Sequence, residues 1–311
     1  ASGVEERFPW NLAPLRAIAI LSTVGFGAPM GTESPAAHIG FATGTWLGNV
    51  NSALRPLVRP LAIGGGAASV SALMGIPLVG SFFMFELSGR RQIPLTPERG
   101  AAMLAGGLVG WGINVAFNLQ LIRLVVPKVP PADLWNAMGA TLFIGVATGT
   151  ITALTGEAIY WARGLRTKPA IRLLIGSLAM LLLAVEIAQI ALLRAASTTA
   201  AVLAGGCGGV FVPFLAIGDL SGRVFATIFG ISGDLAGAAG AAAGIAGGYR
   251  LPLTAVAMVL GVGGPETAQI TCLGTVVIAA FSGLLAARLA SQVSSTIRTI
   301  GRQKSRLGNG D

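Results

Sequence analysis

The chain has 311 residues, of which 53% are hydrophobic and only 11% charged, with a mean hydropathy of +0.76. Because soluble domains carry roughly 25% charged residues, this composition excludes an ordinary soluble protein. The formal net charge is +9, but the basic residues gather at the ends of apolar stretches, which argues against nucleic-acid binding and indicates cytoplasmic loops. The three basic clusters are Arg90 and Arg91; Arg163, Arg166, Lys168 and Arg172; and Arg298, Arg302, Lys304 and Arg306.

Apolar stretches recur along the chain with the length of a membrane span, which is about 20 residues. They predict an all-α polytopic membrane protein of the plasma or inner membrane. The candidate spans are 13–30, 61–87, 101–122, 135–162, 170–193, 196–229, 235–262 and 268–290. Two cysteines, Cys207 and Cys272, have small apolar neighbours typical of packing thiols, and a single histidine offers no histidine-based metal cluster.

The spans predict four parts of the chain. They are a cytoplasmic segment 1–11, a first membrane part 12–122 that is incomplete at its N-terminal end, a second membrane part 133–290, and a basic tail 291–311. The connection between 170–183 and 184–204 is short for two separate helices. Together with the first residue, Ala1, this favours a sequence from which segments have been left out.

Two stretches of the first membrane part return in the second. GTESPAAHIG (31–40) matches GVFVPFLAIG (209–218) at Gly, Pro, Ile and Gly without a gap, 178 positions later. IPLVGSFFMFEL (76–87) is echoed by LPLTAVAMVLGV (251–262), 175 positions later. An internal repeat of this kind predicts a transporter architecture, in which broken helices of the two halves meet near the bilayer midplane.

Each half contains a glycine-rich break that leads into proline, GFGAPMGTESP before the first helix and GGCGGVFVP before the second. Proline is favoured in the first turn of a helix. A helix start has backbone N–H groups without partners and carries about half a positive charge from the helix dipole. Two such starts that face one point would bind an anion without a basic side chain.

Glu33 lies at the opening of the first of these helices, although a charged residue at membrane depth costs roughly 3 kcal/mol. One interpretation is that its carboxylate competes with a permeating anion and acts as a gate when it swings away or is protonated. The other is that Glu33 caps its helix, as acidic residues commonly do. The spacing alone leaves both interpretations open.

Three stretches resemble motifs of the CLC chloride channels and proton/chloride exchangers. GTESPAAHIG resembles the family's G-(K/R)-E-G-P motif, GGVFVP its G-x-F-x-P motif, and GGYRLPLTAVAMVL its R-x-P-L-T segment. The resemblance covers most of residues 12–290. It implies a CLC-like inverted repeat, chloride or a similar small anion as the partner within a lipid bilayer, and a homodimer with one pathway per subunit. It implies no cofactor.

Carried over to this sequence, the resemblance makes Glu33 the gate. It places the anion against the backbone N–H groups of Thr32, Glu33 and Ser34 from the first half and of Val210, Phe211 and Val212 from the second. Thr32 replaces a basic residue and Ser34 replaces a glycine of the family's motif. The family's G-S-G-I-P motif and its pathway tyrosine in the last helix are both missing, since the only tyrosines are Tyr160 and Tyr249.

Proton coupling in the family's exchangers depends on an internal glutamate, which aligns here with Leu87. Glu86, one residue earlier, is the candidate for a proton path, although on a helix it points about 100° away from that position. The structural alternative is an ion pair with Arg90 at i+4. Without a carboxylate at Leu87, the sequence favours channel-like or weakly proton-coupled passage.

Two further classes of protein stay open. A secondary transporter of another fold could carry an organic anion, but it would need Arg or Asn side chains facing the break. An enzyme needs convergent polar groups, and the spans offer few besides Glu33, so no enzymatic activity is expected. Among the remaining polar residues, His38 either tunes Glu33 or packs, and Asp219 is expected to pair with Arg223 at i+4.

Overall fold

The computed structural model describes residues 12–25, 30–90, 94–119, 127, 129–164, 171, 175–176, 191–204, 209–263 and 270–307. These residues are almost entirely helical, as predicted. The first half contains α1 (Ala13–Gly25), α2 (Glu33–Val50), η2 (Ser52–Leu57), α3 (Val58–Met74), α4 (Val79–Arg90) and α5 (Pro97–Phe117). The second contains η3 (Pro131–Asp133), α6 (Leu134–Gly164), α8 (Ala191–Leu203), α9 (Phe211–Phe229), α10 (Gly233–Tyr249), α11 (Pro252–Gly263) and α12 (Ile270–Leu307).

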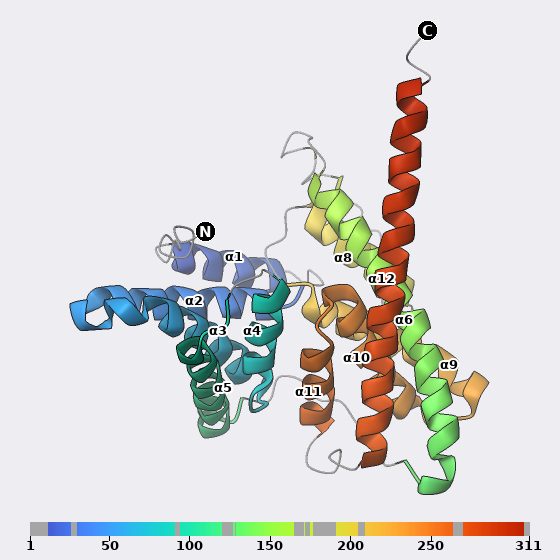
Figure 1. The fold of residues 1–311 in the computed structure, drawn as a ribbon, viewed down its shortest axis with the longest axis horizontal. Coiled ribbons are helices and arrows are strands. Elements are labelled where there is room, and N and C mark those ends of the chain that lie inside the picture. The colour runs from blue at the N-terminus through green and yellow to red at the C-terminus, as the bar shows by residue number, and fades with distance from the viewer. Residues whose placement is uncertain are drawn as a thin grey trace.

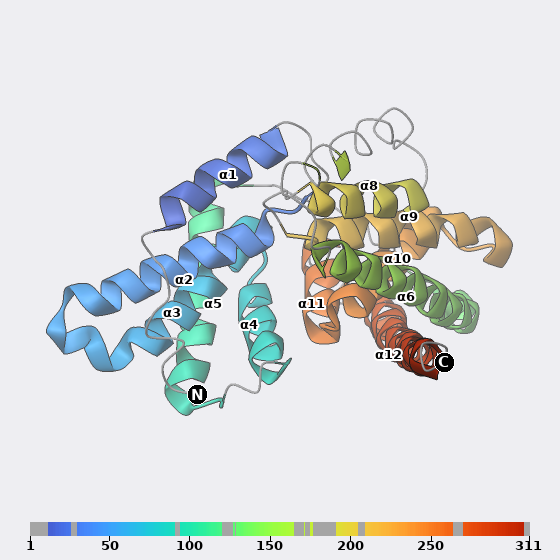
Figure 2. The ribbon, with the colours of Figure 1, turned by 90° about the horizontal axis from the view of Figure 1, so that it is seen from above.

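Most helices of the first half have an equivalent helix in the second half. Helix α1 and helix α8 have the same length and lie 178 positions apart, and α3 and α10 have the same length and lie 175 positions apart. Helices α2 and α9 begin at equivalent positions, Glu33 and Phe211. The two halves lie side by side, with α4 of the first half next to α11 of the second (Figures 1 and 2). The internal repeat predicted from two short stretches therefore extends over most of the helices.

Small residues allow the paired helices of each half to approach closely. A Cβ placed on Gly65 of α3 would overlap the carbonyl oxygen of Gly40 in α2, and one on Gly240 of α10 would overlap that of Gly218 in α9. These two contacts are equivalent by the repeat. In a membrane, burial of apolar surface contributes little to the association of helices. Glycine pairs of this kind let two helices approach closely enough to gain dispersion contacts instead.

Two of the predicted spans are in fact pairs of helices. The candidate 61–87 is divided between α3 and α4, and the candidate 235–262 between α10 and α11, so both single-span predictions were wrong. The cause is a left-handed residue after the first helix of each pair, Gly75 (φ +69°) and Arg250 (φ +58°), which are equivalent positions. A residue in this conformation ends a helix. The break within the candidate 196–229 falls between α8 and α9, as the glycine-rich stretch predicted.

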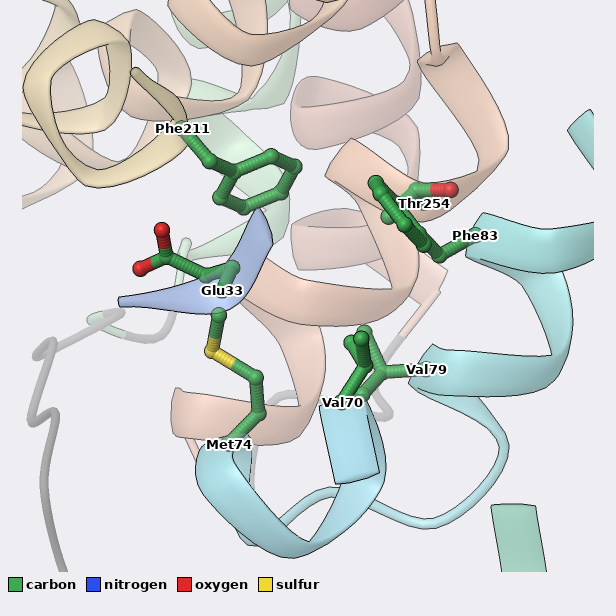
Figure 3. Close-up of a pocket in the computed structure, with 7 residues that line it drawn as sticks. All are labelled: Glu33, Val70, Met74, Val79, Phe83, Phe211 and Thr254. Atoms are coloured by element: carbon green, nitrogen blue, oxygen red, sulfur yellow. The ribbon is translucent and has the colours of Figure 1, made fainter. Parts of the chain in front are cut away.

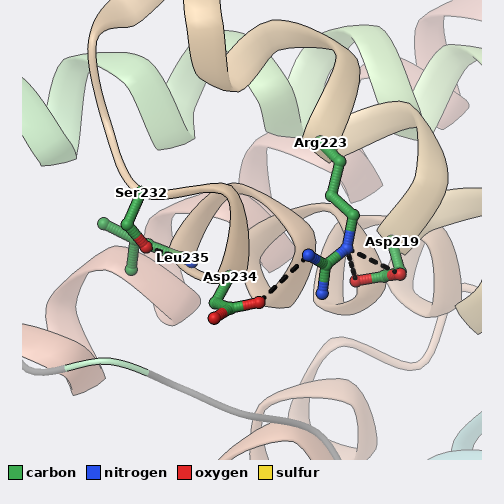
Figure 4. Close-up of polar contacts among 5 residues, drawn as sticks. All are labelled: Asp219, Arg223, Ser232, Asp234 and Leu235. Atoms are coloured by element: carbon green, nitrogen blue, oxygen red, sulfur yellow. Dashed lines mark hydrogen bonds and ion pairs between the residues drawn. The ribbon is translucent and has the colours of Figure 1, made fainter.

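Asp219 and Arg223 form the predicted ion pair on α9, with 3.1 Å between the Arg223 Nε and the Asp219 carboxylate. Arg223 also reaches across to Asp234 in the first turn of α10 at 3.0 Å (Figure 4). The Ser232 hydroxyl accepts a hydrogen bond from the Leu235 N–H and caps that helix. These contacts fix the turn that joins α9 to α10.

Five helical segments within the described residues are long and apolar enough to cross a membrane. They are Ser52–Met74, Pro97–Phe117, Pro131–Gly164, Phe211–Phe229 and Thr271–Val293. Helix α12 continues beyond its apolar part to Leu307 and projects past the other helices (Figure 1). The predicted tail 291–311 thus begins inside a helix.

Candidate anion site

The two glycine-rich breaks meet in an antiparallel bridge between Gly31 and Gly209. The Gly31 N–H donates to the Gly209 carbonyl and the Gly209 N–H donates to the Gly31 carbonyl, each at 2.5 Å. These are the same two residues that the sequence repeat aligns. An antiparallel bridge between equivalent residues is the contact that a two-fold relation between the halves produces. It holds the starts of α2 and α9 next to each other.

Both helix starts leave backbone donors at the bridge. Helix α2 begins at Glu33 after Thr32, helix α9 begins at Phe211 after Val210, and neither preceding residue caps its helix with its own side chain. Pro35 and Pro213 occupy the third position of each helix and have no N–H. The positive ends of two helix dipoles therefore converge at one place. The structure brings together the backbone of all the predicted anion-site residues: Thr32, Glu33, Ser34, Val210, Phe211 and Val212.

The region where the starts of α2 and α9 meet is called the joint. The Glu33 side chain lies in it and is only 2% exposed. Neither carboxylate oxygen has a hydrogen-bond partner in the described part of the structure. The backbone N–H groups of Glu33 and Val212 are nonetheless near enough to interact with it electrostatically. The side chain folds back over the bridge, because a Cβ on Gly31 would overlap its Oε2. A carboxylate of the first half thus lies against a backbone donor of the second.

A small apolar cavity adjoins Glu33, with space for about one water molecule. In Figure 3 the Glu33 carboxylate points away from Phe83 and Thr254, which lie on the other side of the cavity. The residues that line it come from both halves: Glu33, Val70, Met74, Val79, Phe83, Phe211 and Thr254. Carboxylate and cavity are neighbours, but the carboxylate is turned out of the cavity.

Glu86 makes contacts that the sequence did not predict. Its carboxylate accepts hydrogen bonds from the backbone N–H groups of Leu253 at 2.8 Å and Thr254 at 2.9 Å, and from the Thr254 hydroxyl. Leu253 and Thr254 belong to the first turn of α11, where N–H groups have no partner within the helix. Glu86 therefore caps a helix of the other half and joins α4 to α11. The predicted partner, the Arg90 side chain, lies outside the described residues.

Other predicted residues lie away from the joint. The His38 Nδ1 is 2.7 Å from a guanidinium nitrogen of Arg16 in α1, so the ring nitrogen is an acceptor there. Cys272 is fully buried, with its thiol 3.3 Å from the Pro127 carbonyl oxygen, which fits the predicted packing role. Cys207 lies outside the described residues.

Tyr249 is a residue of the joint that sequence reasoning missed. Its hydroxyl accepts a hydrogen bond from the Val210 N–H at 3.2 Å. This N–H was predicted to face an anion directly, and in the structure it donates to the tyrosine instead. Tyr249 lies 175 positions after Met74, which lines the cavity next to Glu33, but methionine is apolar and gave the sequence no signal for a hydroxyl at this position.

Fold and site define a multi-pass helical membrane protein whose two halves each contribute a helix start to one central joint. The family described as "Voltage gated chloride channel" matches residues 1–191 and 184–284. The chain belongs to the voltage-gated chloride channel (CLC) family. It is an integral membrane protein.

Curated relatives and solved structures agree with this assignment. The H(+)/Cl(-) exchange transporter ClcA of Yersinia pestis is 25% identical over 356 aligned residues, covering 96% of this chain and 74% of the relative. ClcA of Klebsiella pneumoniae is 25% identical over 320 aligned residues, covering 88% of this chain and 67% of the relative. The crystal structure of a CLC-type fluoride/proton antiporter superposes with a TM-score of 0.74 at 21% identity, covering 89% of this chain and 75% of its own. The crystal structure of a eukaryotic CLC transporter superposes with a TM-score of 0.64 at 18% identity, covering 86% of this chain and 52% of that one.

Proposed function

We propose that this chain passes chloride or a similar small anion across the bilayer through the joint between α2 and α9, with Glu33 as the gate. The observation that carries the proposal is the buried Glu33 carboxylate, which has no hydrogen-bond partner in the described residues and lies where two helix starts converge. A carboxylate placed there is a covalently attached competitor for any anion that these backbone N–H groups bind. The alternative role, capping of α2, is not supported by a capping hydrogen bond from this side chain.

The size and chemistry of the site support a small anion over an organic one. The cavity next to Glu33 accommodates about one water molecule and is otherwise lined by apolar residues and Thr254. Among the described residues that line it there is no Arg or Asn, although an organic anion would require such side chains. Backbone N–H groups at helix ends suit a compact ion that has shed most of its water.

Passage is proposed to be channel-like or weakly proton-coupled. Glu86, the candidate for a proton path, uses its carboxylate to hold the start of α11, and Leu87 occupies the position that aligns with the exchangers' glutamate. The homodimer and the division into parts 12–122 and 133–290 also remain proposals. Cross-linking in native membranes tests the first of these.

Chloride efflux from proteoliposomes tests the proposed function. The full chain is expected to release chloride, and Glu33→Ala is expected to change the rate because it removes the competing carboxylate. Glu98→Ala is the matched control, since Glu98 is an exposed carboxylate in the first turn of another helix, α5. Absence of chloride flux from the wild-type protein, or identical flux and pH response in Glu33→Ala, would refute the proposal.

A further inference from the structure

Helices α4 and α11, which the repeat relates, do not begin at equivalent positions. The repeat aligns Ile76-Pro77-Leu78 with Leu251-Pro252-Leu253. Helix α11 begins at Pro252, because proline is favoured in the first turn of a helix, whereas α4 begins only at Val79. The first half therefore lacks two helical residues that the second half has, although the two sequences are nearly the same there.

The backbone of Leu78 is the cause of this difference. Its φ angle is +64°, in the left-handed region, where leucine carries a conformational penalty that glycine does not. The other described residues with positive φ that are not glycine are Asn118 and Arg250. Each of these comes directly after the last residue of a helix, where the left-handed conformation is common. Leu78 instead precedes a helix, so the end of a helix does not explain its conformation.

The hydrogen bonds at the two helix starts differ accordingly. In α11 the Ala255 N–H donates to the Leu251 carbonyl at 3.0 Å and closes the first turn. The equivalent Gly80 N–H of α4 donates instead to the hydroxyl of Ser71 in α3, also at 3.0 Å. Ser71 is equivalent to Ala246, which has no hydroxyl. Ser71 thus provides the acceptor that a complete first turn of α4 would provide from its own backbone.

A second contact holds α4 in this conformation, which we call its short form. Glu86 caps the first turn of α11, but its equivalent, Gly261, has no side chain that could cap α4. The Ile76 side chain occupies the space at Gly261, because a Cβ there would overlap the Ile76 Cγ2. The short form is therefore stabilised by this contact and by the Ser71 hydrogen bond, against the conformational penalty at Leu78.

The start of α4 also forms part of the wall of the cavity beside Glu33. Val79, the first residue of α4, lines the cavity together with its repeat equivalent, Thr254 of α11 (Figure 3). In the short form this cavity accommodates about one water molecule. A carboxylate group is larger than one water molecule, so the wall has to move before the Glu33 side chain gains room there.

We propose that the first turn of α4 is a conformational switch that controls the space beside Glu33, an inference that rests on the proposed function. When Leu78 becomes helical, α4 gains the turn that α11 already has, and this is its long form. The Gly80 N–H then exchanges the Ser71 hydroxyl for the Ile76 carbonyl. The start of α4 separates from α3 and takes Val79 with it, so the cavity enlarges and the Glu33 carboxylate has room to leave the joint.

Chloride efflux from proteoliposomes that contain the full chain tests the switch. Leu78→Gly should slow efflux about tenfold, because glycine has no penalty in the left-handed region and is a poorer helix residue, and both effects favour the short form. Asn118→Gly is the matched control, since it changes another left-handed residue, after the end of α5, and it should leave efflux unchanged. Equal or faster efflux from Leu78→Gly, while Glu33→Ala still alters the rate, overturns the inference and leaves the proposed function intact. No efflux from the wild type overturns both.

Ser71→Ala tests the switch from the opposite direction, and it decides the matter if Leu78→Gly does not fold. This change removes the acceptor of the Gly80 N–H, and the long form provides another, so efflux should rise several-fold. Ser69→Ala is its control, because that hydroxyl donates to the Gly66 carbonyl within α3, and efflux should stay at the wild-type rate. Equal or slower efflux from Ser71→Ala would show that Ser71 only supports the fold, and it would overturn the inference.

Discussion

Gly31 and Gly209 exchange two backbone hydrogen bonds, although 178 positions separate them in the sequence. They are equivalent residues of the repeat, so the pair marks the point about which the two halves are related. Every group in the proposed anion site lies within a few residues of this pair. The position of Glu33 depends on it as well, because the carboxylate folds back over Gly31.

Gly31→Ala should expel the Glu33 carboxylate from the joint. The new Cβ would overlap the Glu33 Oε2, and the φ angle of Gly31 is not in the left-handed region, so the collision is the main effect. We expect the free energy of unfolding to fall by about 1–3 kcal/mol, as for other overpacked sites. In a Glu33→Ala background the collision is gone, and the cost should shrink.

Thermal unfolding of the two single variants and the double variant measures this coupling. Gly112→Ala in α5 is the control, because its Cβ would meet nothing within 4 Å. An equal cost of Gly31→Ala with and without the Glu33 carboxylate would show that the side chain does not lie over the bridge.

Glu33→Gln should remove the pH response of anion flux. Glutamine has the size of a protonated glutamate but carries no charge at any pH, so a gate that opens on protonation cannot respond to protons in this variant. Chloride efflux measured across a pH series should be flat for Glu33→Gln and sloped for the wild type and for Glu98→Gln. A variant that follows the wild-type profile would assign the pH response to another group.

Glu86→Ala should loosen the contact between α4 and α11. The change leaves the N–H groups of Leu253 and Thr254 without their acceptor. Thr254 is buried, and an unsatisfied buried donor costs about 1–3 kcal/mol, whereas the exposed Leu253 can turn to water. Glu86→Gln keeps one acceptor oxygen and should lose less stability. Hydrogen exchange of the α11 amides reports the effect directly. Unchanged exchange in Glu86→Ala would contradict the capping role, and proton flux driven by a chloride gradient that depends on Glu86 would contradict weak coupling.

Arg223→Met should lower stability by less than about 1 kcal/mol, even though it removes contacts with both Asp219 and Asp234. The Arg223 side chain is 42% exposed and that of Asp234 is 47% exposed, and ion pairs in such positions contribute little. Thermal unfolding at low and high salt checks this, with Asp133→Asn as an exposed control. A loss of several kcal/mol would show that this turn is much more enclosed than the structure indicates.

The sequence was sufficient to predict the repeat, the two breaks and the position of Glu33 at their meeting point. Glycine, proline and a costly carboxylate are local signals, and each falls where the structure has a helix start. Contacts between distant segments left no comparable signal. Glu86 caps a helix that begins 166 positions later at Pro252, and no sequence pattern around Glu86 predicts this contact. Tyr249 was missed because its hydroxyl meets Val210 only after α10 folds back on α9. The division of 235–262 was missed because Arg250 adopts a conformation usual for glycine, and that of 61–87 was missed because Gly75, which adopts the same conformation, is one of many glycines in that span.

Bromide binding tests the central claim most directly, because bromide resembles chloride and scatters X-rays anomalously. Crystals of Glu33→Gln soaked in bromide should show an anomalous peak within hydrogen-bond distance of the Phe211 and Val212 N–H groups, stronger than in the wild type, in which the carboxylate competes. Bromide flux through the Glu33→Gln protein without any such peak between the starts of α2 and α9 would contradict the account.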